Sequence, residues 1–254
     1  MQATRFEYRF RFAIHVLIYV LGFGLVPLLD RFTPGIVQAL SIATRSTWLI
    51  AASILARQHL LTFSTATVVL LIVALVFTGL GAWFRLWGAA YVGARVVKSS
   101  EMHGERMLAD GPYRRTRNPL YLGTLLHTIG LAILMPPVGA ALAIALVWIF
   151  QIRLALAEEP FLTAKFGQAY VEYKNAVPRF LPAPTPQVAA SGAQAHWGQA
   201  VLGELYFIGV FVTMAVFGWN FNADPMFRGI LISLGAGIVA RAFLPQAAQE
   251  SQVH

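Results

Sequence analysis

The chain alternates between long apolar runs and short polar stretches, and this pattern sets the expected architecture. A membrane-spanning helix needs about 20 consecutive, mostly apolar residues. The first run meets this length without a charge until its end, whereas Arg45 interrupts the second. The pattern predicts an all-α fold, a polytopic transmembrane helical bundle of about seven spans. The expected spans are residues 12–29, 36–56, 66–84, 120–135, 138–152, 201–219 and 227–244.

The composition supports an integral membrane protein. The 254 residues are 57% hydrophobic and 12% charged, whereas soluble domains are about 45–50% apolar and about 25% charged. The formal net charge is +8, and in an apolar chain Lys and Arg typically mark cytosolic loops that face anionic lipid. We therefore expect the lipid bilayer as a partner, and no nucleic acid. The chain has no cysteine, which excludes disulfides and thiolate metal sites.

The basic residues predict the orientation. Segment 85–118 holds seven basic residues against three acidic ones, so this loop and 153–200 are expected to face the cytosol. If all three preceding runs span the membrane, the N-terminus lies outside. If 36–56 is re-entrant, the N-terminus lies inside, which suits its own three arginines. The two cytosolic loops and the C-terminal runs favour three spans.

Two short runs, 120–135 and 138–152, carry the most information. Sixteen residues form a helix of roughly 24 Å, and Pro136-Pro137 cannot continue it, so the chain turns at the far end. The result is a short helical hairpin at 120–153 whose two open ends share one membrane face. That face gathers Arg117, Asn118 and Tyr121 from one end and Arg153, Glu158 and Glu159 from the other.

Taken singly, these residues have simpler explanations. The arginines of 114–117 can anchor the loop at lipid headgroups, and the tyrosines can belong to an interfacial aromatic belt. Asn118-Pro119 is a typical helix start, and Glu158-Glu159 can be solvated charges. Their convergence on one face favours a binding site instead.

The motifs resemble a known family. "GPYRRTRNPLYLG" at 111–123 is followed, after 34 residues, by "EEPFLTAKFGQAYVEYKNAVPRFLP" from Glu158. With "WFRLWGAAYVG" ahead of them, they resemble the isoprenylcysteine carboxyl methyltransferases and their phospholipid methyltransferase relatives over about residues 83–182. The resemblance implies methyl transfer from S-adenosyl-L-methionine, bound in a pocket open to the cytosol, to a lipophilic methyl acceptor that enters from the bilayer.

The resemblance also implies the site residues. Arginines and helix N–H groups suit the carboxylate of this cofactor, glutamates suit its ammonium or ribose hydroxyls, and aromatic faces suit its sulfonium. No metal is implied, and the run Glu101, His103, Glu105 is interpreted as a solvated turn. Catalysis is expected to use Arg117, Asn118, Glu159 and Arg179; cofactor binding Tyr113, Arg117, Asn118, Pro119, Tyr121, Gly123, Glu158 and Glu159; and substrate binding Arg153.

One departure from the family pattern is Asn118, which stands where the family has His. Asn cannot titrate near pH 7, so the residue is expected to hydrogen-bond rather than to act as a base. The departure leaves an alternative open, a non-catalytic membrane scaffold or lipid-binding relative that retains the fold. A transporter is disfavoured because the chain lacks paired, interrupted repeats. No protein partner can be inferred.

The predicted organisation has four parts. Residues 1–84 are N-terminal transmembrane helices, and 85–182 form the methyltransferase core. A Pro- and Ala-rich linker follows at 183–200, and 201–254 add a C-terminal helix pair. Because this pair lies outside the matched region, truncation after Pro182 is expected to leave cofactor binding largely intact.

Overall fold

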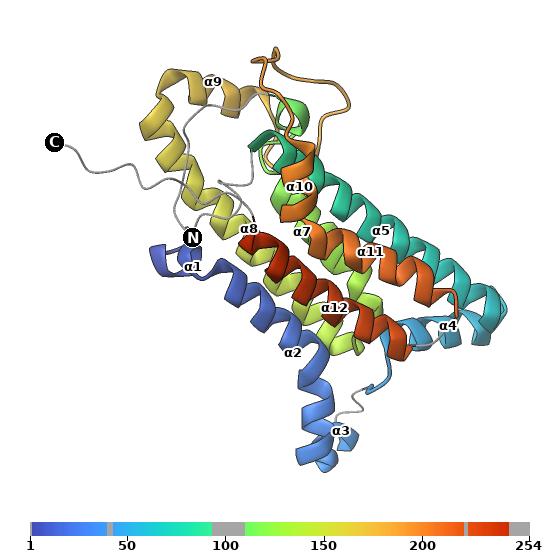
Figure 1. Ribbon diagram of the computed structural model, residues 1–254. Coiled ribbons are helices and arrows are strands. Elements are labelled where there is room, and N and C mark those ends of the chain that lie inside the picture. Colours follow the sequence, from blue (N-terminus) through green and yellow to red (C-terminus); the bar gives the residue numbers. More distant parts are fainter. Residues whose placement is uncertain (1, 40–42, 93–109, 221–222, 244–254) are drawn as a thin grey trace.

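The computed structural model describes residues 2–39, 43–92, 110–220 and 223–243, and its regular elements are all helical (Figure 1). The predicted all-α class is confirmed. Short 3₁₀ helices, η1 (Gly111–Arg114) and η2 (Ala132–Leu134), join longer elements. The α-helices are α1 (Arg5–Arg9), α2 (Arg11–Phe32), α3 (Pro34–Ala39), α4 (Thr47–Arg57), α5 (Phe63–Val92), α7 (Pro119–Leu131), α8 (Pro137–Phe166), α9 (Gln168–Ala176), α10 (Trp197–Gly203), α11 (Leu205–Gly218) and α12 (Ala223–Ala242).

The number of membrane spans is lower than predicted. Among the described residues, three helices are long and apolar enough to cross a membrane, namely α2, α5 and α8, and the bent pair α10–α11 would make a fourth. The prediction of about seven spans is too high, because hydropathy does not show where helices end. α4 and α7 have 11 and 13 residues, or roughly 16 and 20 Å, and α12 carries Asp224 and Arg228. The chain is a multi-pass membrane protein with several short helices.

The run 36–56 does not cross the bundle, and this corrects the predicted position of the N-terminus. It is divided between α3 and α4, and α4 begins beside the hairpin tip, where the Thr47 hydroxyl donates to the Met135 carbonyl at 2.8 Å. α5 therefore starts at the same end at which α2 finishes. The N-terminal residues lie at the other end of the bundle (Figure 1). There the Tyr8 hydroxyl donates to Glu158. The N-terminus and the basic 111–118 segment thus share one face.

The hairpin forms as predicted, with a longer second arm. Proline at the first position of both α7 and α8 suits a helix start, because no N–H is lost there. α8 continues past residue 152 to Phe166 with Pro160 inside it, and Gly167, whose φ is +56°, caps its end. The extension carries Glu158 and Glu159 on a helix rather than on a loop.

α5 and α7 pack backbone to backbone at a pair of glycines. A Cβ added to Gly81 would lie 2.7 Å from the His127 amide nitrogen and 2.8 Å from the Gly123 carbonyl oxygen. One added to Gly123 would lie 2.6 Å from Arg85 Cγ. Only glycine permits this approach, which places the Arg85 side chain directly against α7.

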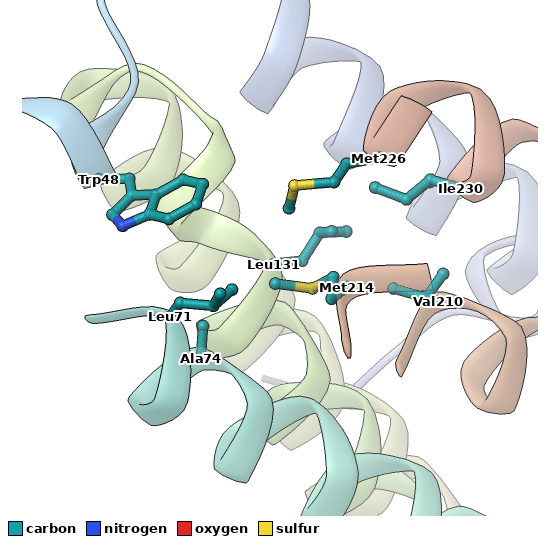
Figure 2. Packing of buried hydrophobic residues seen from close by; sticks show 8 residues of the cluster. All are labelled: Trp48, Leu71, Ala74, Leu131, Val210, Met214, Met226 and Ile230. Atoms are coloured by element: carbon teal, nitrogen blue, oxygen red, sulfur yellow. The ribbon is translucent and has the colours of Figure 1, made fainter. Parts of the chain in front are cut away.

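The main core joins the C-terminal helices to the rest of the bundle. Figure 2 shows side chains of α11 and α12 packed against those of α4, α5 and α7, and all eight are buried. The predicted boundary between residues 84 and 85 lies inside the continuous helix α5. The cluster comprises Trp48, Leu71, Ala74, Leu131, Val210, Met214, Met226 and Ile230.

Candidate functional site

Glu158 joins three helices at the open end of the hairpin. Its Oε1 accepts a hydrogen bond from the Tyr121 hydroxyl of α7 and another, at 3.0 Å, from the Tyr8 hydroxyl of α1. The contact between Tyr121 and Glu158 is the one that the hairpin geometry predicted. Both hydroxyls share one oxygen, so the other oxygen lies outside this pair of bonds.

Glu159, the next residue, holds two arginines. Arg117 Nη1 lies 2.8 Å from Glu159 Oε1, and Arg179 Nε lies 2.7 Å from the same oxygen. Arg179 Nη2 reaches Oε2 at 3.1 Å, which makes this pair bidentate and raises the pKa of Arg179. The side chains of Arg117 and Glu159 are 10% and 14% exposed, a level at which a charge needs a partner.

The backbone of the 178–180 segment is fixed beside the same cluster. The Arg117 amide donates to the Pro178 carbonyl at 2.9 Å, and Asn118 Nδ2 donates to the Arg179 carbonyl at 3.0 Å. The Thr116 hydroxyl donates to the Phe180 carbonyl at 2.9 Å. Proline at 178 stops α9, so the chain turns back and delivers Arg179 to Glu159.

The segment predicted as a linker, 183–200, lies along the 110–115 loop. Arg114 Nε donates to the Val188 carbonyl at 2.9 Å, and the Ala183 amide donates to the Arg115 carbonyl at 2.9 Å. Asp110 accepts bonds from the amides of Ser191 and Ala193, at 3.0 and 2.7 Å. Burial alone would raise the pKa of Asp110, but the bonds from the Ser191 hydroxyl and these amides outweigh it and lower the pKa.

Two predicted site residues pack on α5. Pro119 lies against Gly88, where a Cβ would be 3.3 Å from the Pro119 ring, and Gly123 lies against Arg85. Tyr113 takes part through its backbone, since its carbonyl accepts the Tyr173 hydroxyl at 2.8 Å. A cofactor role for these three residues stays a prediction.

Arg153, the predicted substrate-binding residue, is held by the N-terminal segment. Its Nη2 lies 2.8 Å from both carboxylate oxygens of Glu7. Hydrogen bonds from Arg153 and then from Thr4 lower the pKa of the Glu7 carboxyl to about 2. Thr4 and Glu7 also form a reciprocal capping box that starts α1. Substrate binding by Arg153 stays a prediction.

The start of α7 and Arg117 present further donors. Asn118 precedes the helix but makes no side-chain cap, since its amide group is bonded to Arg179. The first backbone N–H groups of α7 therefore lack the usual side-chain acceptor. Arg117 Nε is buried, and within the described part of the chain no acceptor meets it. The cluster thus has donor groups to offer an anionic ligand.

Metal ligands do not gather in the described residues, where no group of three or more His, Cys, Asp or Glu side chains could hold an ion. The run Glu101, His103, Glu105 lies outside the described residues.

Sequence reasoning missed four residues that the fold connects to the site. Tyr8 bonds Glu158, and Glu7 bonds Arg153. Glu204 forms a buried ion pair with Arg85. Two signals were available. Glu7 is the first acidic residue of a basic segment, and Glu204 is the lone charge in the run 201–219. An ionisable residue inside an apolar span usually has a specific partner.

Comparison with known proteins finds similarity to one family over the hairpin and its polar end. The sequence model described as "Phospholipid methyltransferase" matches residues 69–169. We call residues 69–169 the family segment. This family segment contains Arg85, Arg117, Tyr121 and Glu158-Glu159, and it excludes the N-terminal and C-terminal helices that contact them.

Curated relatives match a similar length of the chain. The protein-S-isoprenylcysteine O-methyltransferase of Schizosaccharomyces pombe is 29% identical over 43% of this chain and 48% of its own length. Protein-S-isoprenylcysteine O-methyltransferase A of Arabidopsis thaliana is 31% identical over 37% and 48%. The cobalt-zinc-cadmium resistance protein CzcN of Cupriavidus metallidurans is 32% identical over 39% and 42%. The chain thus spans about half the length of the relatives it matches. No solved structure matches it significantly.

Proposed function

We propose that the protein is an integral membrane methyltransferase that uses S-adenosyl-L-methionine and modifies a lipid-like or small hydrophobic acceptor. The observation that carries the proposal is the polar cluster at the open end of the hairpin, whose residues lie inside the family segment except for Arg179. There Glu158 bonds Tyr121, and Glu159 bonds Arg117 and Arg179. The relatives named protein-S-isoprenylcysteine O-methyltransferase support the reaction class.

The donor set suits this cofactor by charge. Two groups suit the carboxylate of the cofactor. One is Arg117, whose buried Nε has no acceptor among the described residues, and the other is the uncapped start of α7. Glu158 suits the ammonium or a ribose hydroxyl, and Tyr121 adds an aromatic face for a cation. When bound, S-adenosyl-L-methionine supplies a methyl group already activated on a sulfonium. The protein then needs to bind the two reactants, orient them and exclude water. A covalent nucleophile is not required.

Asn118 acts, on this proposal, as a positioning residue rather than as a base. Its Nδ2 donates to the Arg179 carbonyl, which fixes the segment whose guanidinium holds Glu159. An amide performs this role at any pH because it does not titrate. The exchange of the family's His for Asn is therefore compatible with activity.

Calorimetry with S-adenosylhomocysteine tests the proposed function. Detergent-purified, full-length protein is expected to bind this product of the cofactor at one site per chain, with the start of α7 and Glu158 as the binding groups. Absence of binding to correctly folded protein at millimolar ligand would refute the proposal. That result would favour the lipid-binding relative without catalysis.

The site is expected to face the cytosol, where the cofactor is available. The chain has no cysteine, so single cysteines are clean probes. The sequence suggests Ser100, in the basic loop, as the position for such a probe, but it lies outside the described residues. Ala189 is exposed beside the 110–115 loop and takes its place. In intact cells Ala189→Cys should resist an impermeant thiol reagent and react only after lysis.

Gln58→Cys is the matched control for this topology, because Gln58 is exposed and follows α4 at the opposite end of the bundle. It should react before lysis. The reverse labelling pattern would place the cluster outside the cell.

A further inference from the structure

The deepest ion pair in the described structure joins the family segment to the C-terminal helices. Arg85 Nε lies 2.5 Å from Glu204 Oε2, and Arg85 Nη2 lies 2.9 Å from Oε1. The side chains are 9% and 0% exposed. Arg85 is on α5, inside the family segment, whereas Glu204 follows α10, outside it. The segment's buried cation therefore takes its counter-charge from the C-terminal part.

Arg85 uses its remaining donor group on the first turns of α7. Its Nη1 lies 2.8 Å from the Thr124 hydroxyl oxygen and 3.3 Å from the Leu120 carbonyl oxygen. Its guanidinium carbon lies 4.1 Å from the centre of the Phe207 ring on α11. One guanidinium thus contacts α7, Phe207 of α11 and Glu204 at the end of α10.

The turn that Arg85 grips also carries the cluster. Tyr121, which bonds Glu158, follows Leu120 directly. Gly123, on the same turn, lies against the Arg85 stem. A shift of the Arg85 head would therefore let this turn rotate or slide, and would move the Tyr121 hydroxyl from Glu158.

Arg85 needs the Glu204 carboxylate to keep its contacts with α7. A buried guanidinium without a carboxylate is strongly unfavourable and seeks water, and in a membrane helix it extends toward the interface. Both Glu204 oxygens are bonded to Arg85. The carboxylate therefore fixes the plane of the guanidinium and balances its positive charge. Arg85 is then free to offer Nη1 to α7.

We infer that Glu204 is a positioning residue of the cofactor site, acting through Arg85 on α7, and that the C-terminal helices complete this site. The inference rests on the proposed function. It reverses the sequence-based expectation that truncation after Pro182 spares cofactor binding. Truncation would leave Arg85 without its carboxylate and would uncover the α5 and α7 side chains that Met214 and Met226 cover (Figure 2).

Three variants of the full chain test the inference, with S-adenosylhomocysteine affinity and thermal unfolding in detergent as readouts. Glu204→Gln keeps the shape but removes the charge, and should weaken binding at least tenfold and lower Tm. Glu204→Asp keeps the charge and should bind within about threefold of wild type. The double variant Arg85→Met with Glu204→Leu replaces the pair by apolar side chains, an exchange that often preserves stability. It should recover Tm but still bind at least tenfold more weakly, because the contacts to Leu120 and Thr124 are gone.

Glu172→Gln is the matched control, since Glu172 is exposed on α9 and bonds only Gln168 among the described residues. It should leave both readouts unchanged. Wild-type affinity in Glu204→Gln or in the double variant would overturn the inference. So would failure of all three variants to fold, which would show a role in folding alone. Wild-type protein that does not bind would instead refute the proposed function.

Discussion

Glu158→Ala is expected to weaken S-adenosylhomocysteine binding by at least tenfold, which corresponds to about 1.4 kcal/mol. The carboxylate is the shared acceptor of the Tyr8 and Tyr121 hydroxyls, so its loss removes a ligand-binding group and releases two helices together. Tyr121→Ala should have an effect of similar size, because the site loses the aromatic face and the bond that orients Glu158. Calorimetry on detergent-purified protein measures both.

Tyr121→Phe separates the two contributions of that side chain, since it keeps the ring and removes the hydroxyl. Its affinity should fall between those of wild type and Tyr121→Ala. Glu172→Ala, on the exposed face of α9, controls for loss of a glutamate and should bind normally. Unchanged affinity in both Glu158→Ala and Tyr121→Ala, with the protein folded, would refute the site assignment.

Gly81→Ala is expected to destabilise the bundle by about 1–3 kcal/mol, the usual cost of overpacking. The new methyl group would meet the His127 amide nitrogen at 2.7 Å and the Gly123 carbonyl oxygen at 2.8 Å. Both are backbone atoms of α7, so relief requires the two helices to separate. Thermal unfolding in detergent should show a lower Tm.

Gly35→Ala is the control for this change. It lies in α3, where nothing stands within 4 Å of an added Cβ, and alanine is the better helix former. Its Tm should equal or exceed that of wild type. Equal Tm values for Gly81→Ala and wild type would mean that α5 and α7 are not in backbone contact.

The sequence predicted the hairpin because its signals are local. Pro136-Pro137 places the turn, and apolar length places both open ends on one face, so the meeting of Tyr121 with Glu158 followed from arithmetic. Pro178 stops the preceding helix and so indicates that the chain turns back toward the hairpin, but the sequence leaves Glu158, Glu159 and the cofactor open as partners of Arg179; the structure pairs it with Glu159.

The rest depended on contacts between distant segments. The bonds from Tyr8 to Glu158 and from Arg85 to Glu204 span 150 and 119 residues, and no periodicity encodes such pairings. The number of spans failed for a related reason. Residues 36–56 are apolar enough for a helix, but the contact between Thr47 and Met135 keeps α4 at one end of the bundle. Hydropathy measures how apolar a run is and does not show whether the helix crosses the bundle or stays at one end of it.

The ion pair between Arg85 and Glu204 also has a consequence for the order of biosynthesis. The two residues are 119 positions apart, and at about 5–20 residues per second a ribosome adds Glu204 about 6–24 s after Arg85. α7 is synthesised within that interval, so both helices exist before the guanidinium has Glu204 to bond. We therefore expect Arg85 to extend toward lipid headgroups and water until the C-terminal helices emerge. We expect α5 and α7 to pack together finally only after most of the chain has been inserted.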